Sequence, residues 1–526
     1  MLHRNIGRFT GLMCACIIAL AFGIQLFNAR TSRAQEGRTA KGKLSSVPAE
    51  DLNWPLPPGV DKSYDAVDAK KLHRYVEELA ATSDRYRDAG NQWWGRIDGT
   101  SGMTESQNWI KEKFKEIGVP TETVTLPDPK DLPKSWEVSV SANGKTVKLE
   151  SSSPFIDFPR SVPTPKGDEE LDAVWVSLGQ PSDFLGKDVG GKAVFIYSIP
   201  QVGNLLQSSD WMEAVGRAEK AGAAAIIVDI AIPGNMHYVS HIDGGRMKDL
   251  KIPIFTIGNQ DGHTVEELNA MNNGVGLKTH LRWEIEHYPD AKEDIVIGKL
   301  QGMTDENIIL LAHMDGYFEG ATDDASGTAT VLGTAEYFAR MPKEERRRTM
   351  YFISMPDHHG GDKAGTWLHE NFKSILAKTA VVTNAEHVSA GDWVFDRQRT
   401  YSNAEPSLVP TNSSYPGWWG VYGSDRLAHI VAHDFATFGV PTQIGAGGME
   451  SQLTKVQFDA PSFYLVDKNF FFHSEADTPD KVVAGALRNV VQAFAKIYND
   501  VNKLELKDLQ APPSERPGAV GSDQGQ

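Results

Sequence analysis

Apolar residues recur in two patterns along the chain, one typical of helices and one typical of strands. A first helix is indicated by four apolar residues at helical spacing: Leu72, Tyr75, Val76 and Leu79. A second helix is expected to begin at the capping box of residues 104–107 and to end at Gly118. A β-hairpin follows, in which apolar and polar residues alternate on both sides of the turn Asn143-Gly144.

From residue 152 to residue 283 the pattern changes to short apolar runs separated by glycines. Four of these runs are strand candidates: Ala173–Val176, Ala193–Tyr197, Ala224–Val228 and Ile252–Ile257. A helix over Trp211–Ala221 leads into the third strand. No cluster of charged residues here suggests catalysis, so we interpret 152–283 as an inserted unit.

The last large unit, 284–506, alternates buried strands with helices. Its strands are predicted at Ile308–Ala312, Met350–Met355, Ala380–Ala385 and Ser462–Val466. Its helices are predicted at Thr328–Arg340, Asp425–Phe438 and Asp480–Val501. This alternation predicts an α/β fold built on an open, mostly parallel sheet with helices on both faces. Ligand sites in such sheets lie at the carboxyl ends of the strands.

The first 34 residues have the order of a secretory signal peptide. Two arginines precede an uncharged stretch, 9–27, and the small residues Ser32 and Ala34 stand before a cleavage position at Gln35. The alternative is an uncleaved membrane anchor, because this stretch is almost long enough to span a bilayer. In both cases we expect the working part of the protein to be exported, secreted or periplasmic. The membrane is expected as a partner only if the segment stays uncleaved.

The chain is therefore expected to have six segments. They are the signal peptide or signal anchor 1–34, a polar linker 35–60, an N-terminal part of the main unit 61–151, the inserted unit 152–283, the main α/β unit 284–506, and a disordered tail 507–526 rich in Pro, Gly and Ser. Nothing in the sequence indicates an oligomeric state.

Charge and cysteine content narrow the possible chemistry. The 526-residue chain has a formal net charge of −16, which disfavours nucleic acid as a partner because phosphate backbones are also negative. Its two cysteines, Cys14 and Cys16, lie inside the N-terminal apolar stretch. Disulfides, zinc–thiolate sites and cysteine nucleophiles are therefore excluded from the rest of the chain.

Metal-binding side chains follow four of the predicted strands. They are His313 and Asp315 after the first, Asp357, His358 and His359 after the second, Glu386 and His387 after the third, and His473 after the fourth. Asp323 and Asp324 lie in the loop before the helix 328–340, where Asp324 alone is explained equally well as a helix N-cap. Imidazoles and carboxylates gathered at one sheet edge, without thiols, predict a divalent-cation site with nitrogen and oxygen ligands.

The same residues resemble the core motifs of the M28 zinc peptidases, a family that includes secreted aminopeptidases and glutamate carboxypeptidases. The most specific match is His313-Met314-Asp315 followed by Asp323-Asp324-Ala325-Ser326-Gly327. Asn384-Ala385-Glu386 resembles the later Asn-Ala-Asp motif, and Phe472-His473-Ser474 with Asp477-Thr478 resembles the closing His motif.

The inserted unit resembles a protease-associated (PA) domain. The resemblance rests on Gly191-Lys192-Ala193-Val194, Ala221-Gly222-Ala223 and Ile252-Pro253. Together the two resemblances imply a zinc-exopeptidase-like fold for 61–151 and 284–506. They also imply that 152–283 is a small inserted PA domain rich in β-strand.

Carried over residue by residue, the resemblance implies two zinc ions bridged by Asp323. One ion would be held by His313 and Glu386, and the other by His473 and His358. Asp315 would orient His313 through its second ring nitrogen. Asp357 would be the general base that accepts a proton from the attacking water.

The chain departs from the family pattern at three of these positions. The family normally has Glu-Glu where this chain has Asp357-His358, and Asp where this chain has Glu386. Each replacement keeps a chemically competent side chain, so we expect an active site. His359 is an alternative ligand to His358, and His387 to Glu386; the sequence leaves both choices open. The nitrogen-rich shell favours zinc or cobalt and weakens the second metal site.

These inferences predict an exported, metal-dependent exopeptidase that acts on peptides, with aminopeptidase activity as the first expectation. The negative net charge places a glutamate-carboxypeptidase-like activity second. A catalytically inactive, peptide-binding homologue is the alternative from another functional class, because the Glu-Glu pair is altered. Hydrolysis of a non-peptide amide is a third possibility.

Overall fold

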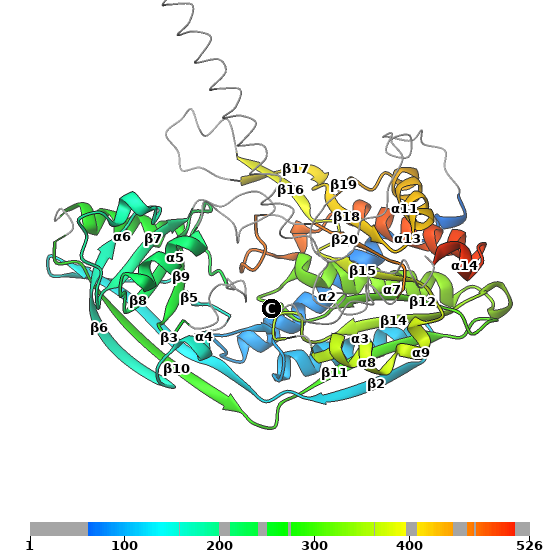
Figure 1. Cartoon of the computed structure of the whole chain (residues 1–526), viewed down its shortest axis with the longest axis horizontal. Coiled ribbons are helices and arrows are strands. Elements are labelled where there is room, and N and C mark those ends of the chain that lie inside the picture. The colour runs from blue at the N-terminus through cyan, green and yellow to red at the C-terminus, as the bar shows by residue number, and fades with distance from the viewer. Residues whose placement is uncertain are drawn as a thin grey trace, which may run out of the picture.

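The computed structural model describes residues 62–156, 158–198, 211–239, 250–271, 275–361, 363–395, 408–444, 460–467 and 470–510. The predicted signal segment 1–34 and linker 35–60 lie outside these ranges. Within them, no helix combines the length and the apolar character needed to cross a bilayer. Two large β-sheets organise the described chain, and Figure 1 shows them at opposite ends of the molecule.

The first sheet has eight strands in the order β19-β18-β20-β15-β12-β14-β11-β2. At its centre β12 (Asn307–His313) runs parallel to β14 (Thr349–Met355) and to β15 (Thr379–Glu386), and β15 runs parallel to β20 (Ser462–Val466). Every residue of these four strands is buried, as expected for strands covered on both faces. They coincide with the four predicted apolar runs, so the prediction of a parallel sheet is confirmed.

The outer strands of this sheet are mostly antiparallel. They are β18 (Gly417–Tyr422) beside β20, β11 (Lys292–Leu300) beside β14, and β2 (Thr121–Pro127) beside β11. At the far edge, β19 (Thr442–Ile444) runs parallel to β18.

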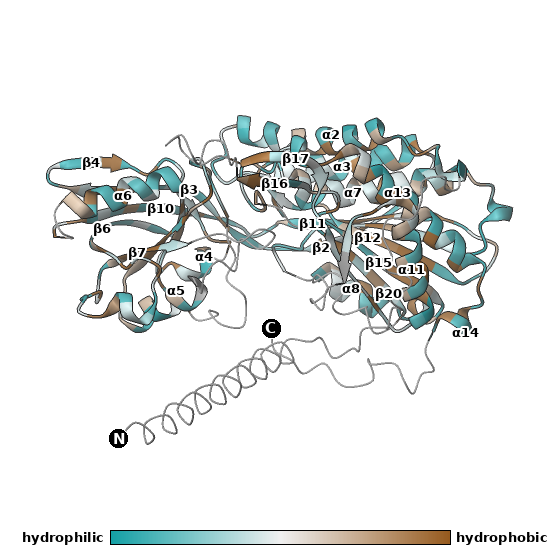
Figure 2. Cartoon of the chain, turned by 90° about the horizontal axis from the view of Figure 1, so that it is seen from above, coloured by the Kyte–Doolittle hydropathy of each residue, from teal (hydrophilic) through white to brown (hydrophobic). Residues whose placement is uncertain are grey.

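Helices cover both faces of the first sheet because successive strand residues point to opposite sides. Ile308 and Leu310 of β12 belong to one apolar cluster, and Ile309 and Leu311 belong to another. The first cluster packs against α2 (Ala69–Asp88), α3 (Ser101–Glu116), α7 (Ser326–Ala339), α11 (Asp425–Phe438) and α13 (Ala484–Asn502). The second packs against α8 (Lys363–Asn371) and α9 (Lys373–Leu376). Figure 2 shows apolar strands of this sheet between helices that carry hydrophilic residues outside.

The start predicted for the second helix is wrong by about one turn. The N-cap of α3 is Thr100, whose side chain accepts a hydrogen bond from the Met103 backbone N–H. Residues 104–107 therefore lie inside the helix, and the predicted capping box is not used. The predicted end is confirmed, since α3 stops at Glu116 and Gly118 has a φ of 77°.

The second sheet has eight strands in the order β4-β3-β10-β6-β7-β8-β9-β5. Its parallel part consists of β6 (Lys166–Trp175), β7 (Ala193–Ser198), β8 (Ala225–Ile230) and β9 (Ile254–Gly258), which confirms the four predicted strands. Helix α5 (Trp211–Lys220) packs on one face and α6 (Asn259–Met271) on the other. The short β5 (Ser153–Pro154) pairs with β9, and α4 (Phe158–Ser161) follows it.

The second sheet extends beyond the range 152–283 predicted for the inserted unit. The predicted hairpin forms β3 (Lys130–Ala142) and β4 (Lys145–Lys148), and Asn143 and Gly144 at its turn have φ values of 53° and 73°. Strand β3 pairs along its length with β10 (Lys278–Tyr288), which also pairs with β6. The chain thus enters and leaves this sheet through two adjacent antiparallel strands, which run toward β2 and β11 in Figure 1.

Three smaller features complete the described fold. Strand β1 (Gly95–Arg96) pairs with β13 (Gly316–Tyr317), and β16 (Gly391–Phe395) pairs with β17 (Leu408–Ser414). The start of the tail predicted to be disordered forms α14 (Leu506–Leu509), in which Leu509 is 1% exposed. The prediction of disorder is therefore wrong for 507–509, because Leu509 packs into the main core.

Candidate metal centre

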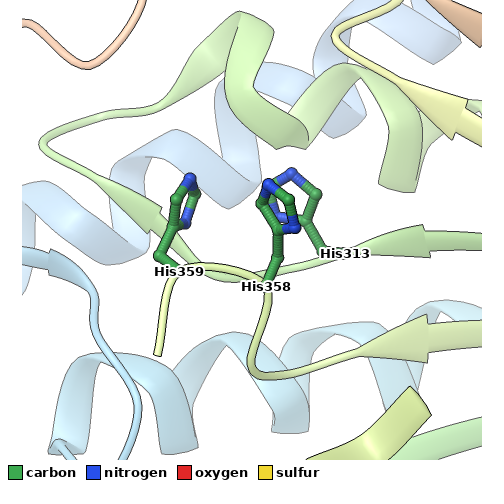
Figure 3. A group of neighbouring side chains, drawn as sticks. All are labelled: His313, His358 and His359. Atoms are coloured by element: carbon green, nitrogen blue, oxygen red, sulfur yellow. The ribbon is translucent and has the colours of Figure 1, made fainter. Parts of the chain in front are cut away.

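Strand ends bring the predicted side chains to one edge of the first sheet. His313 is the last residue of β12 and Glu386 is the last residue of β15, while His358 and His359 follow β14 directly. In Figure 3 the rings of His313, His358 and His359 stand close together beyond the ends of their strands. His473 reaches the same place from the segment after β20.

Asp323 lies at the centre of this arrangement and faces two groups of side chains. Its Oδ1 lies 3.1 Å from His313 Nε2 and 3.0 Å from His387 Nε2. Glu386 Oε1 lies 3.0 Å from His313 Nε2 and 3.4 Å from His387 Nε2. These four residues form the first group, and all of them are buried.

The second group of side chains faces the other carboxylate oxygen of Asp323. Asp323 Oδ2 is 3.0 Å from His473 Nε2 and 3.4 Å from His359 Nε2. The two Nε2 atoms are 3.0 Å apart. Asp323 therefore has one oxygen in each group, the arrangement of a carboxylate that bridges two ions.

The second nitrogen of each histidine faces a hydrogen-bond acceptor, which determines its tautomer. The Nδ1 atoms of His313 and His359 donate to the two oxygens of the Asp315 carboxylate, over 3.2 and 2.8 Å. His387 Nδ1 donates to the Asp467 backbone carbonyl over 3.1 Å, and His473 Nδ1 to the Val239 carbonyl over 3.0 Å. With Nδ1 protonated in this way, an imidazole in its neutral form presents an Nε2 lone pair to Asp323.

The donor set fits a pair of metal ions. Lone pairs and carboxylate oxygens that face one another repel unless a cation lies between them. His313 Nε2, His387 Nε2, Glu386 Oε1 and both oxygens of Asp323 are buried without a hydrogen-bond partner among the described residues. Two ligands of one tetrahedral zinc ion lie about 3.3 Å apart when each bond is about 2.0–2.1 Å. The spacings of 3.0–3.4 Å within the two groups agree with that value.

Burial raises the pKa values of the carboxylates in the centre, and the nearby histidines lower them. Burial raises the pKa of Asp323, but His387 and His359 together hold that pKa well below its usual range. Burial also raises the pKa of Glu386, yet the nearby histidines, His313 above all, lower it to about 2. Both carboxylates are therefore ionised. Burial lowers the pKa of His358 to about 3, with Glu386 opposing it, so this imidazole is neutral.

Two histidines of the centre have backbone conformations that occur in neither right-handed helices nor strands. His387 and His473 have φ values of 49° and 59°, in the left-handed region that residues with a Cβ rarely adopt. Such conformations persist where surrounding contacts hold them, and they are common at functional sites. Here the contacts are hydrogen bonds from the His387 N–H to Asp324 Oδ1 (3.0 Å) and from the Val239 N–H to the His473 carbonyl (2.9 Å).

Residues 237–239, in the segment between β8 and β9 of the second sheet, contribute directly to the centre. Tyr238 forms an antiparallel bridge with Ser474, and the carbonyl of Val239 accepts the hydrogen bond from His473 Nδ1. The His237 N–H donates to Glu475 Oε1 over 3.0 Å, and the Glu475 N–H donates to the His237 carbonyl over 3.1 Å. The orientation of His473 therefore depends on this segment between β8 and β9, which the sequence did not indicate.

Two of the predicted site residues lie outside the two groups around Asp323. Asp357 Oδ2 accepts hydrogen bonds from the N–H groups of Lys363 (2.6 Å) and Ala364 (3.1 Å), so it caps α8 and belongs to neither group around Asp323. His358 also lies outside the group of Asp323 and His473, where His359 stands instead. The reason is the turn after β14, in which the His359 N–H and Nδ1–H both donate to Asp315 Oδ2.

The structure brings the other predicted residues together. His313, Asp323, Glu386 and His473 all lie in the two groups, and Asp315 contacts His313 as expected. His387, which the sequence offered as a substitute for Glu386, joins Glu386 in the first group. Glu386 is held by Asn384, whose Nδ2 donates to Glu386 Oε2 over 3.0 Å.

A buried arginine that the sequence did not indicate holds the turn before α7. Arg96 is 0% exposed, and its guanidinium donates to the carbonyls of Met314 (2.7 Å), Glu319 (2.5 Å) and Gly320 (2.8 Å). Asp477 holds the same turn from the other side by accepting the N–H of Asp323 over 3.0 Å. A lone arginine in a short strand gives no sequence signal for such a role.

Replacing Arg96 with methionine is expected to destabilise the protein. The substitution keeps the length of the side chain but leaves several buried carbonyls without donors, so we expect a loss of about 3–5 kcal/mol in the free energy of unfolding. Urea unfolding followed by tryptophan fluorescence measures it. The control is Arg85→Met, since Arg85 is 54% exposed and its ion pair with Glu105 should contribute less than about 1 kcal/mol. Equal losses in the two variants would contradict the role given to Arg96.

Replacing Asp315 with asparagine is expected to weaken metal binding. Asp315 accepts hydrogen bonds from both His313 and His359, and an amide group cannot accept on both sides. We expect zinc affinity to fall by about 10–100-fold, the usual effect of losing the partner of a ligating histidine. Competition with a chromogenic chelator measures this. Asp131→Asn, in an exposed Asp–His pair, is the matched control and should leave the affinity unchanged.

Comparison with known proteins finds a family match over part of the chain. The family model described as Peptidase family M28 matches residues 295–357, which include His313, Asp315 and Asp323. Over these residues the chain resembles peptidase family M28. The match supports an enzyme of the hydrolase class and a metallopeptidase, as the motifs led us to expect.

Solved structures agree on the fold of this chain. A peptidase M28 precursor from Shewanella amazonensis SB2B has a TM-score of 0.59 at 16% identity, covering 86% of this chain and 99% of that one. BSAP, a zinc aminopeptidase from Bacillus subtilis, has a TM-score of 0.56 at 16% identity, covering 84% and 98%. An aminopeptidase from Aneurinibacillus sp. strain AM-1 has a TM-score of 0.51 at 18% identity, covering 83% and 94%. A search of curated protein sequences finds no match.

Proposed function

We propose that this protein is an exported M28 aminopeptidase with two zinc ions. The observation that carries the proposal is the set of four imidazole Nε2 atoms directed at the two oxygens of Asp323. Such a nitrogen-rich shell suits zinc better than magnesium or calcium. The similar structure from Bacillus subtilis is that of a zinc aminopeptidase, which supports the choice of metal and of activity.

The ligands we propose differ in part from those expected from the sequence. His313, Asp323, Glu386 and His387 would hold one ion, and Asp323, His359 and His473 the other. Glu386 Oε1 and His387 Nε2 are both directed at the first group, so neither replaces the other. His359 takes the place that His358 was expected to fill.

His358 is the proposed proton acceptor, in place of Asp357. Its Nε2 lies 3.6 Å from Glu386 Oε1, its ring centre is 4.5 Å from that of His313, and its side chain is 14% exposed. It thus lies beside the first group, on the side that solvent reaches. Bound zinc ions would supply a nucleophilic water and polarise the peptide carbonyl. His358 would accept the proton of that water at Nε2, with Glu386 stabilising the imidazolium, and would then pass the proton to the leaving amine.

Hydrolysis of an aminoacyl p-nitroanilide tests this function. We expect the protein to release p-nitroaniline from leucine p-nitroanilide, to lose the activity in 1,10-phenanthroline, and to regain it with added zinc. The matched substrate is N-acetyl-leucine p-nitroanilide, which an aminopeptidase should leave intact. Cleavage of the blocked substrate alone would contradict aminopeptidase activity. Zinc binding without cleavage of either substrate would instead favour the peptide-binding alternative.

The N-terminal segment supports the proposal of export. Two arginines, an uncharged stretch and small residues before Gln35 have the order of a signal peptide, although they lie outside the described residues. We further propose that the second sheet belongs to a PA-like domain inserted in the peptidase domain. N-terminal sequencing of protein collected from outside the cytoplasm should begin at Gln35; a chain that still begins at Met1 would support the uncleaved anchor.

A further inference from the structure

A second cluster of buried carboxylates lies beneath the loop that carries His358 and His359. Asp98 follows β1, Asp128 follows β2, and Glu293 is the second residue of β11. One oxygen from each residue lies within 4.8 Å of the others, and the residues are 3%, 3% and 1% exposed. None of the three belongs to the groups around Asp323.

Two lysines neutralise part of the negative charge of this cluster. Lys130 Nζ lies 2.7 Å from Asp98 Oδ2 and 2.6 Å from Asp128 Oδ2. Lys363 Nζ contacts Asp128 Oδ1 from the solvent side, with its own side chain 46% exposed. Asp98 is therefore paired through one oxygen and Asp128 through both, and among the described residues neither lysine forms an ion pair with Glu293.

Glu293 gives independent evidence that a positively charged partner is missing from this cluster. Both of its oxygens are buried without a hydrogen-bond partner among the described residues, and so is Asp98 Oδ1. An ionised carboxylate left unpaired in the interior costs several kcal/mol, so it must take up a proton or meet a cation. Burial and the charges of Asp357, Asp98 and Asp128 raise the pKa of Glu293 to about 10, the direction expected for a carboxylate among other buried carboxylates.

Charge balance indicates how much positive charge is missing. Asp98, Asp128, Glu293 and the neighbouring Asp357 supply four negative charges, whereas Lys130 and Lys363 supply two positive ones. When all are ionised, two negative charges remain unbalanced. One divalent cation would neutralise the cluster completely, whereas a single proton on Glu293 would leave one negative charge.

We propose that Asp98, Asp128 and Glu293 form a binding site for a calcium-class cation, separate from the zinc centre. The available donors are carboxylate oxygens without any imidazole, which suits calcium rather than zinc. The site would also support the loop of the zinc centre. A Cβ atom added at Gly360, the residue after His359, would lie 2.4 Å from Asp98 Oδ2 and 2.5 Å from Lys130 Nζ, so the loop rests directly on the cluster.

Calcium titration of the whole protein, at a fixed free zinc concentration, tests this proposal. Isothermal titration calorimetry should show one bound Ca²⁺ per chain. Tm should rise by about 3 °C when free Ca²⁺ exceeds its Kd by about 100-fold. Glu293→Gln keeps the shape of the side chain and should abolish both effects, while the zinc content stays that of the wild type. The control Glu122→Gln, at an exposed position of the neighbouring strand β2, should respond to Ca²⁺ as the wild type does.

Two results would overturn the proposal. If the wild-type protein neither binds Ca²⁺ nor changes its Tm, Glu293 is held neutral by a proton instead. If Glu293→Gln binds Ca²⁺ as tightly as the wild type, the cation lies elsewhere. Should Glu293→Gln fail to fold, Asp98→Asn provides the same comparison, because Asp98 contributes its unpartnered Oδ1 to the same site.

Discussion

Asp323→Asn is expected to abolish hydrolysis and to remove most of the bound zinc. Asp323 is the one carboxylate with an oxygen in each ligand group, at 3.1 Å from His313 Nε2 and 3.0 Å from His473 Nε2. An asparagine keeps the shape but has one acceptor oxygen, and its NH₂ group would face the imidazole nitrogens on the other side. We expect kcat/KM to fall by more than about 100-fold, beyond the roughly 10–100-fold that follows loss of an outer partner of a ligand.

The comparison needs a control that changes charge without touching the centre. Asp305→Asn serves, because Asp305 is 76% exposed and pairs only with Lys378 among the described residues. It should keep the zinc content and kcat/KM of the wild type. If Asp323→Asn also kept both, the bridging role of Asp323 would be wrong, and the proposed function with it.

His358→Ala and His359→Ala are expected to fail in different ways. His359 Nε2 lies 3.0 Å from His473 Nε2 and 3.4 Å from Asp323 Oδ2, so His359→Ala should lose one zinc equivalent per chain together with activity. His358 lies outside that group, so His358→Ala should keep its zinc. Because His358 is the proposed proton acceptor, its loss should lower kcat by about 10²–10⁴-fold with little change in KM.

Zinc content and kinetics of the same preparations separate these two roles. The reverse outcome, zinc lost from His358→Ala and kept by His359→Ala, would restore the ligand first expected from the sequence. Asp357→Asn provides a further check. Since Asp357 caps α8 through two backbone N–H groups, its substitution should lower stability more than kcat.

The strands that carry the centre were predictable because they are buried on both faces. Short, continuous apolar runs such as Ile308–Ala312 are characteristic of central parallel strands. The polar residue that ends each run then marks the sheet edge where ligands gather. In this way His313, Asp323, Glu386 and His473 could be placed together from the sequence.

The choice between neighbouring residues was not predictable from pattern alone. Whether residue 358 or residue 359 faces Asp323 depends on the turn after β14, which Asp315 holds through the His359 N–H and Nδ1–H. Likewise, the positive φ of His387 lets its side chain join that of Glu386 at Asp323. Backbone conformations of single loop residues leave no periodic signal in a sequence.

The boundary of the second sheet was missed for a different reason. The hairpin of β3 and β4 was visible as an alternating pattern with an Asn-Gly turn. Its membership of the second sheet depends on pairing between Val138 and Leu281, which are far apart in sequence. Alternation specifies a strand but not its partner, so the hairpin was assigned to the wrong unit. The support of His473 by Val239 was hidden in the same way.

The zinc content of the wild-type chain tests the central claim most directly. Protein dialysed exhaustively against metal-free buffer would be measured by elemental analysis. The two ligand groups that share Asp323 predict two zinc equivalents per chain. Wild-type protein that is folded, holds no zinc after dialysis and takes up none when zinc is added back would contradict the account, because the imidazole nitrogens directed at Asp323 would then have no ion to bind.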